Sequence, residues 1–353
     1  MAETGQGTQN NTETMVREIL ATIDREREQE IIGRRFGLFD RKETLEQIGE
    51  MLGITRERVR QLEKSVLIKL RQSAEKGNLP HVNDFQSLII SKLEGSGDAS
   101  RIKVIANEIT GSTDREEQSR IAFLCQLCSK LSFIAEDDNY YSGIAIAKVY
   151  SESSIKKEIN NLIEVIKGLK EPLPIEEIAK SANIDQPVKA AALASFSKKL
   201  ATLNGRWGLT KWPLVNPKNI RDKIYVILKE NGKQMHFNEI AEAIKDSDFK
   251  RKDVTTQAIH NELIKDSRFV LIGRGIYALK EWGYKKGTVA DMITEVLKEA
   301  SEPLHRDEIV KRVLKSRFVK ETTILLNLQG KDQFKRVAKA TYTLEEQPAI
   351  SSQ

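Results

Sequence analysis

The chain has 353 residues, of which 39% are hydrophobic, 31% charged and 6% aromatic, a composition typical of a globular protein of two or three domains. It contains no run of about 18 uncharged apolar residues and no basic-then-apolar export signal, so we expect a protein of the cytoplasm with no membrane span. The formal net charge is +6, and residues 210–346 hold 27 basic and 20 acidic residues; this excess indicates either a face that attracts polyanions or an ordinary solvated surface.

The first segment, residues 1–12, consists largely of Gln, Asn, Thr and Gly. It has no apolar periodicity and is expected to be a disordered tail. Turn-forming residues then cluster near 77–80, 95–98, 212–217 and 283–287, and they divide the rest of the chain into pieces. The domains predicted from these breaks span residues 13–75, 85–150, 151–213, 216–284 and 287–346.

Residues 44–62 fit a helix-turn-helix position by position. Thr44 precedes an apolar helix and is followed three residues later by a glutamine, which is the pattern of a capping box. Position 49 needs a small residue because the second helix is expected to cross closely there, and it is occupied by Gly49. Gly53 supplies the left-handed residue of the turn. Thr55 caps the second helix. The inward-facing apolar residues are Ile48, Leu52, Ile54, Val59 and Leu62.

The outward face of this second helix has side chains that can recognise base edges. Arginine donates two parallel hydrogen bonds to guanine, glutamine pairs with adenine, and glutamate accepts a hydrogen bond from the cytosine amino group. The candidate DNA-binding residues are Arg56, Glu57, Arg58, Arg60, Gln61 and Lys64. The alternative is a solvated helix face on which charged residues have no ligand.

Three strings, Arg35 to Leu38, Thr44 to Gly49 and Thr55 to Glu63, resemble region 4 of the primary bacterial sigma factors. The resemblance covers about residues 13–75 and implies that the second helix enters the major groove of the −35 promoter element. It implies that Arg56, Glu57, Arg60 and Gln61 face bases, with Arg58 and Lys64 nearer the backbone.

The same resemblance implies a contact with RNA polymerase. The helices expected at residues 16–23 and 25–36 would hold the flap-tip helix of the polymerase β subunit. A sigma factor also needs a promoter-melting region 2 and a region 3 linker, neither of which is recognised here, so we expect that this chain does not initiate transcription alone.

The chain after residue 84 repeats a pattern. Similar helix starts occur at Asn107, Glu176, Asn238 and Asp307, which lie 69, 62 and 69 residues apart. Each start is followed by another helix and two short β-like runs around a turn, which is typical of a winged helix. A helical solenoid would repeat at about 34 residues without strands. The predicted fold is therefore mainly α with small β-hairpins, an N-terminal helix-turn-helix and tandem winged helices, of which 85–150 is degenerate.

Residues 216–284 resemble the HARE-type winged helix through Phe237 to Ala241, Ala258 to Leu263 and Gly273 to Trp282. That family includes the N-terminal domain of the δ subunit of Gram-positive RNA polymerase and binds either DNA or the transcription machinery. The candidate DNA-binding residues here are Thr255, Thr256, Gln257, His260, Asn261 and Lys265 on the third helix and Arg274 at the wing tip. Surface caps and solvated polar residues are the alternative.

Chemistry other than binding has little support in the sequence. Cys125 and Cys128 lie in an apolar helix without a second cysteine pair or a nearby histidine, so we expect them in the core and not on zinc. No phosphate-binding loop, zinc-protease motif or serine elbow occurs, so we expect no enzyme activity and no cofactor.

We therefore predict a DNA-binding transcription factor that recognises −35-like duplex DNA, docks on the β flap of RNA polymerase, or does both. One alternative is a δ-like polymerase accessory subunit that acts through protein contacts alone. The other is the DNA-recognition part of a restriction–modification system, because HARE-type modules also occur beside nucleases.

Overall fold

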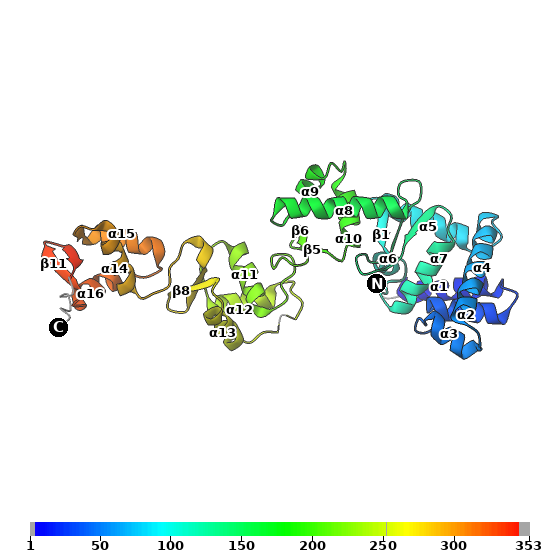
Figure 1. The fold of residues 1–353 in the computed structure, drawn as a ribbon, viewed down its shortest axis with the longest axis horizontal. Helices are drawn as coiled ribbons and strands as arrows, with labels where there is room; N and C mark the ends of the chain where they lie inside the picture. Colours follow the sequence, from blue (N-terminus) through cyan, green and yellow to red (C-terminus); the bar gives the residue numbers. More distant parts are fainter. Residues whose placement is uncertain (1–3, 252, 346–353) are drawn as a thin grey trace. The chain divides into compact units, whose positions relative to one another are not determined.

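A computed structural model describes residues 4–251 and 253–345 of the chain. The molecule divides into two compact units at Lys211/Trp212, at the start of the predicted break at 212–217. Helices dominate both units, and the strands of the described residues form four small antiparallel sheets (Figure 1). The mainly helical fold with small sheets is thus confirmed, whereas the winged-helix assignment stays a prediction. None of the described helices combines the length and apolar character that crossing a bilayer requires.

The first unit begins with five helices. They are α1 (Thr4–Ala21), α2 (Glu26–Phe36), α3 (Leu45–Leu52), α4 (Arg56–Glu75) and α5 (Val82–Glu94). The prediction of a disordered tail over residues 1–12 is wrong from Thr4 onward, and residues 1–3 lie outside the described part. Thr12 is buried, and its hydroxyl donates a hydrogen bond to Glu117 at 2.7 Å. A polar segment is therefore held by a distant carboxylate, which apolar periodicity does not reveal.

The rest of the chain contains four repeats with one order of elements: helix, short strand, helix, helix, strand, strand. The first repeat begins with α5 and continues with β1 (Ala99–Arg101), α6 (Ile102–Thr110), α7 (Arg115–Leu127), β2 (Leu131–Ile134) and β3 (Gly143–Ile146). The second consists of α8 (Glu152–Leu169), β4 (Leu173–Pro174), α9 (Ile175–Ser181), α10 (Pro187–Phe196), β5 (Leu200–Leu203) and β6 (Arg206–Leu209).

The second unit holds the other two repeats. The third consists of α11 (Ile220–Asn231), β7 (Met235–His236), α12 (Phe237–Asp246), α13 (Thr256–Lys265), β8 (Phe269–Gly273) and β9 (Ile276–Leu279). The fourth consists of α14 (Val289–Ala300), β10 (Leu304–His305), α15 (Arg306–Ser316), α16 (Glu321–Gly330), β11 (Phe334–Ala338) and β12 (Thr341–Leu344). In every repeat the last strand lies in the middle of the sheet. Residue 346, the end of the last predicted domain, lies outside the described residues.

The helix-turn-helix region and the first repeat share one hydrophobic core. Buried side chains of α1, α2 and the second half of α4 pack with those of α5, α6 and α7. They include Ile19, Ile32, Val66, Leu70, Phe85, Ile105 and Phe123. The break predicted between residues 75 and 85 therefore does not separate two cores, because α4 continues past the helix-turn-helix and buries its C-terminal face against α7.

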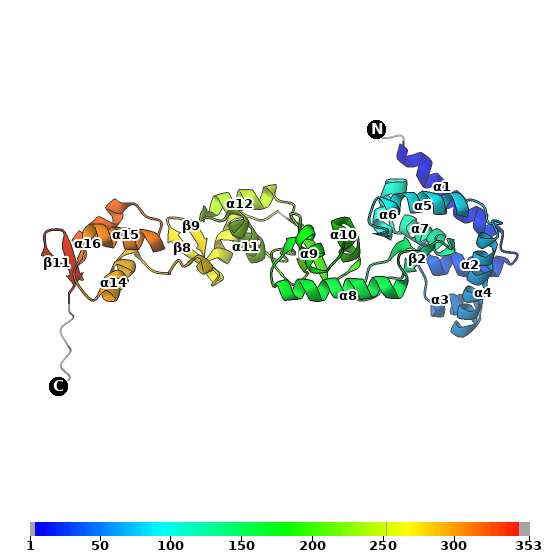
Figure 2. The ribbon, with the colours of Figure 1, turned by 90° about the horizontal axis from the view of Figure 1, so that it is seen from above.

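The first two repeats are joined closely. Phe196, at the end of α10, lies against Gly143 of β3, where an added Cβ would be 2.2 Å from the ring. The Tyr141 N–H donates to the Phe196 carbonyl at 2.8 Å, and the Lys198 N–H donates to the Asn139 carbonyl at 2.8 Å. The helix α8 lies along α9 and α10 (Figure 2). The first unit is thus one continuous packed body.

Candidate nucleic-acid interface

The backbone of the helix-turn-helix is built as predicted. The Thr44 hydroxyl accepts a hydrogen bond from the Gln47 N–H at 3.2 Å, and the Gln47 side chain accepts one from the Thr44 N–H at 2.9 Å. Gly53 has φ +63° at the end of α3. The Thr55 hydroxyl accepts from the Arg58 N–H at 3.2 Å and so caps α4. Each of these contacts satisfies a helix-terminal group that would otherwise be unpaired.

Gly49 is crowded, as expected, but by the turn and not by side chains of the second helix. A Cβ there would lie 2.7 Å from the Ile54 carbonyl oxygen and 3.4 Å from the Arg56 nitrogen. The small core beneath contains the predicted Ile48 and Val59, both fully buried. It also contains Ile31 of α2, which lies outside the helix-turn-helix pattern and was not predicted to belong to this core.

The N-terminal half of α4 is open to solvent. All six residues predicted there, Arg56, Glu57, Arg58, Arg60, Gln61 and Lys64, are exposed. They occupy the first two and a half turns of the helix, the part that a helix-turn-helix protein inserts into a major groove. No neighbouring element within this unit covers them, so the array is available to a ligand.

Four of these side chains form one hydrogen-bonded network. Arg60 donates two hydrogen bonds to the Glu57 carboxylate, at 2.8 and 2.7 Å. Gln61 links to Glu57 at 3.4 Å, and Arg58 donates to the Gln61 side-chain oxygen at 3.4 Å. The hydrogen bond from Arg60 lowers the pKa of Glu57, and Glu57 raises the pKa of Arg60. Glu57 is therefore ionised and Arg60 charged at neutral pH.

This network leaves the side chains free to exchange partners. The Arg60 and Glu57 side chains are 54% and 57% exposed, and exposed ion pairs are weak because water and salt screen them. A base edge can therefore replace Glu57 as the acceptor for Arg60 at little cost. The Glu57 carboxylate would then be free to accept from a cytosine amino group.

The C-terminal half of α4 is fixed to the first repeat. Val66, Leu70 and Ala74 are buried in the shared core, and Arg71 donates to the Gln126 carbonyl of α7 at 2.9 Å. The exposed N-terminal half of α4 is therefore held in place by the buried C-terminal half of the same helix.

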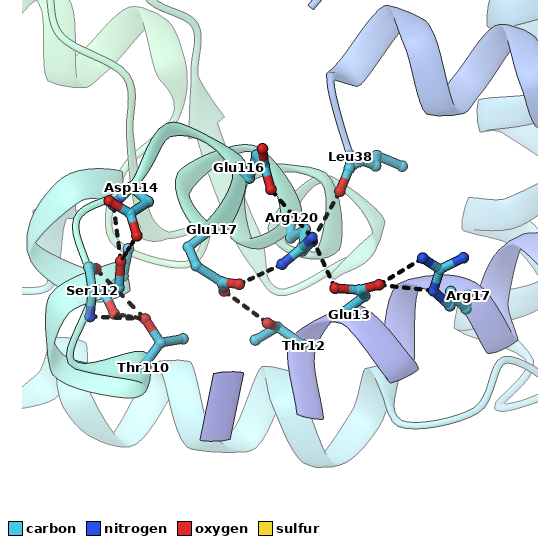
Figure 3. Close-up of polar contacts among 11 residues, drawn as sticks. Thr12, Glu13, Arg17, Leu38, Thr110, Ser112, Asp114, Glu116, Glu117 and Arg120 are labelled. Atoms are coloured by element: carbon cyan, nitrogen blue, oxygen red, sulfur yellow. Dashed lines mark hydrogen bonds and ion pairs between the residues drawn. The ribbon is translucent and has the colours of Figure 1, made fainter. Parts of the chain in front are cut away.

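A buried arginine on α7 links the first repeat to α1 and to the segment between α2 and α3 (Figure 3). Arg120 is 7% exposed and donates to the Leu38 carbonyl, between α2 and α3, at 2.9 Å. Its guanidinium pairs with Glu117 on the same helix and with Glu13 of α1 at 3.0 Å. Glu117 also accepts from Thr12 at 2.7 Å. Three chain segments thus meet at one guanidinium.

A cavity of about 630 Å³ lies between α1 and α2, the helices predicted to hold the polymerase flap. Its apolar lining includes Leu20, Ala21 and Phe39, and charged residues such as Glu30 and Arg34 surround it. On its other side α1 is covered by α6 and α7.

The third helices of the first two repeats pack against several neighbouring elements. Helix α7 is contacted by α1, α2, α4, α5 and α6, and α10 packs against β1, α8 and α9. Helix α10 is also held by its Phe196 against Gly143. The pattern of a repeat predicted these helices, but it did not predict that both would be structural.

The candidates on the third repeat divide into two groups. Gln257 and Asn261, which share a hydrogen bond of 3.0 Å, are exposed, as are Lys265 and Arg274. The others have structural roles or are half-buried. The Thr255 hydroxyl caps α13 by accepting from the Ala258 N–H, and Thr256 is half-buried. The His260 ring is half-buried, 5.0 Å from the Phe237 ring and 6.1 Å from the Tyr277 ring.

The two cysteines lie in the core, as predicted. Cys125 and Cys128 are free thiols with 0% and 4% exposure. Burial raises the pKa of Cys128 to about 12 and that of Cys125 well above its ordinary value. Within residues 4–251 and 253–345, His, Cys, Asp and Glu side chains form no group of three that could hold a metal ion.

Comparison with known proteins bears on the α2–α4 segment. Residues 25–72 match the family model of sigma-70, region 4. The RNA polymerase sigma factor sigB of Arabidopsis thaliana is 48% identical over 54 residues, which are 15% of this chain and 9% of that protein. The RNA polymerase sigma factor SigA of a Bacillus species is 44% identical over 63 residues, 18% of this chain and 16% of that protein. The match thus spans less than a fifth of either relative, and residues 25–72 are a sigma region 4-like DNA-binding segment.

Proposed function

We propose that this chain is a transcription factor that recognises −35-like promoter DNA through the start of α4. The observation that carries the proposal is the exposed row from Arg56 to Lys64, on a capped second helix, within a segment that matches sigma region 4. The protein acts by binding and performs no catalytic turnover.

On this proposal, some of the exposed side chains of α4 contact bases and others contact phosphate. Arg56, Arg60 and Gln61 would donate to base edges, and Glu57 would accept from cytosine once Arg60 has moved to its base. Arg58 and Lys64 would contact phosphate and hold the helix in register. Arg60 would exchange its two hydrogen bonds to Glu57 for hydrogen bonds to a base edge.

RNA polymerase is the protein partner that fits the same segment. The cavity between α1 and α2 is concave, partly apolar and surrounded by charge, which suits the helical flap tip of the β subunit. The open side of α1 and α2 therefore supports polymerase docking as part of the proposal.

The four repeats are, on this proposal, winged-helix modules with unequal roles. Their common order of elements and their hairpins support the assignment. In the first two repeats the third helix joins parts of the protein. In the third repeat Gln257, Asn261, Lys265 and Arg274 are exposed and would add contacts to DNA or to the transcription machinery.

Replacing two arginines of α4 tests the base-reading claim. The variant Arg56→Ala/Arg60→Ala should lose about 10- to 100-fold in affinity for each base pair that these arginines contact in a duplex with a −35 element. It should bind a scrambled duplex almost as well as the parent protein does. Fluorescence anisotropy with both duplexes at several salt concentrations provides the measurement.

The matched control is Arg115→Ala/Arg312→Ala, which removes two exposed arginines elsewhere. Equal affinity of parent and Arg56→Ala/Arg60→Ala for the −35 duplex would remove the base-reading claim. If the parent shows no −35 preference but copurifies with polymerase at high salt, the δ-like accessory role replaces it.

A further inference from the structure

We propose that the hairpin β11–β12 of the fourth repeat binds the phosphate backbone of duplex DNA without reading its sequence. The residues that would hold the phosphates, hereafter the hairpin cations, are Lys331, Lys335, Arg336 and Lys339. The choice of DNA as the polyanion rests on the proposed function, whereas the anionic character of the ligand follows from the hairpin alone.

The hairpin cations are exposed, and among the described residues none of them is held in an ion pair. Residues 331–344 contain a single carboxylate, Asp332. Arg336 donates a hydrogen bond to the Ala338 carbonyl, at 3.2 Å. Elsewhere in the same repeat Arg312 is paired with Glu308 at 2.7 Å. The hairpin therefore presents positive charge to which a polyanion can bind directly.

The cations follow the edge strand β11 and the turn after it. This strand lies at the edge of its sheet, in the order β10-β12-β11, and residues 335–339 are all exposed. Lys335 and Arg336 lie in β11, with side chains that alternate between its two faces, and Lys339 lies in the turn that follows. Because phosphates are closely spaced along duplex DNA, cations spread in this way can contact more than one of them.

The four hairpins differ systematically in charge. The loop of the first carries Glu136 and Asp137, which pair with Lys198 and Lys156 inside the protein. Among the strand and turn residues, the second hairpin has one cation, Arg206, and the third has one, Arg274. The fourth has three, Lys335, Arg336 and Lys339, and Lys331 lies just before its first strand. A general need for soluble surface does not explain this concentration, because the other hairpins lack it.

The helix beside this hairpin has no cation that could contact phosphate. Within Glu321–Gly330, α16 has no lysine or arginine, one acid, and a Leu326 that is 69% exposed. In α4, by contrast, arginines occupy the outward face. The fourth repeat therefore has its cations on the hairpin and no arginine on the neighbouring helix, and we infer an anchor that is indifferent to sequence.

The test replaces all four hairpin cations with glutamine in the full chain. The slope of log affinity against log salt should become shallower by about 3 to 4, because roughly 0.9 of a counterion is released per phosphate contact. Affinity at low salt should fall at least about tenfold, and by the same factor for a −35 duplex and a scrambled one. Anisotropy with both duplexes measures slope and affinity together.

Two further proteins keep the result interpretable. The charge-matched control Lys286→Gln/Lys298→Gln/Lys311→Gln/Lys315→Gln removes four exposed lysines of the second unit and should leave the slope nearly unchanged. Arg336→Lys keeps the charge and should bind as the parent does, while circular dichroism checks folding. If the glutamine variant proves unstable, the smaller Lys335→Gln/Lys339→Gln should show about half the slope change.

Three outcomes would overturn the proposal. One is an unchanged slope, and another is an equal change in the control, which would mean that only total charge matters. The third is an unchanged slope combined with loss of binding to phosphatidylserine vesicles or with new self-association, which would assign the cations to a lipid surface or to protection of an edge strand. Failure of the −35 preference leaves the slope measurement intact, so the two proposals can fail separately.

Discussion

The space at position 49 of the helix-turn-helix admits glycine and no larger residue. An alanine there would bring its Cβ to 2.7 Å from the Ile54 carbonyl oxygen, a backbone atom that cannot rotate away. The turn that sets the direction of α4 would have to shift. Glycine is therefore required by space, although its backbone is helical.

We expect Gly49→Ala to lower the free energy of unfolding by about 1–3 kcal/mol, as overpacking does, and to weaken −35 binding. Gly168→Ala is the matched control, because that helical glycine has no atom within 4 Å of an added Cβ. The control should be neutral or stabilising by up to about 1 kcal/mol. Chemical denaturation measures both, and equal stability of the two variants would contradict the crowding argument.

The thiols of Cys125 and Cys128 should be unreactive in the folded protein. Burial raises the pKa of Cys128 to about 12, against about 8.5 for an unfolded cysteine. At pH 8 iodoacetamide should label the native chain far more slowly than the chain in guanidinium chloride, because the thiolate is the nucleophile. The folded state favours the protonated thiol, so these groups lower stability only as pH rises from about 8.5 toward 12. Rapid native labelling would show that the helix opens.

At the scale of elements, the parts set by local chemistry were predictable. The caps at Thr44 and Thr55, the left-handed Gly53 and the period of Val59 each involve residues within four positions. The exposed face of α4 followed from that period. What could not be predicted depends on distant partners. The apolar residues of α7 and α10 indicate that each helix packs on a core, but not which neighbouring elements contact it.

The joint between the first two repeats is an example of such a distant contact. A methyl group at Gly143 would lie 2.2 Å from the Phe196 ring and 2.8 Å from the Ser100 carbonyl oxygen. We expect Gly143→Ala to cost about 1–3 kcal/mol of unfolding free energy or more. Part of this loss should be recovered in Gly143→Ala/Phe196→Ala relative to the sum of the single changes. Strict additivity in a denaturation cycle would mean that the two residues do not interact.

At the scale of the molecule, the two compact units should unfold separately. Each has its own core, with Ile105 in the first and Ile293 in the second, both nearly or fully buried. Calorimetry should resolve two transitions. Ile105→Ala should lower one and Ile293→Ala the other, each by a loss of about 2–5 kcal/mol. If either substitution moved both transitions equally, the units would be one cooperative structure.

Arg120 restricts the ways in which a partner can reach α1 and α2. Its guanidinium binds Glu13, Glu117 and the Leu38 carbonyl. Removing one of these partners would leave a buried charge without compensation. The segment that matches sigma region 4 is therefore packed rigidly against the first repeat and not joined to it by a flexible linker. On the proposed function, a polymerase would reach this segment from the cavity side, and binding of the segment to a promoter would bring the first two repeats to the same stretch of DNA.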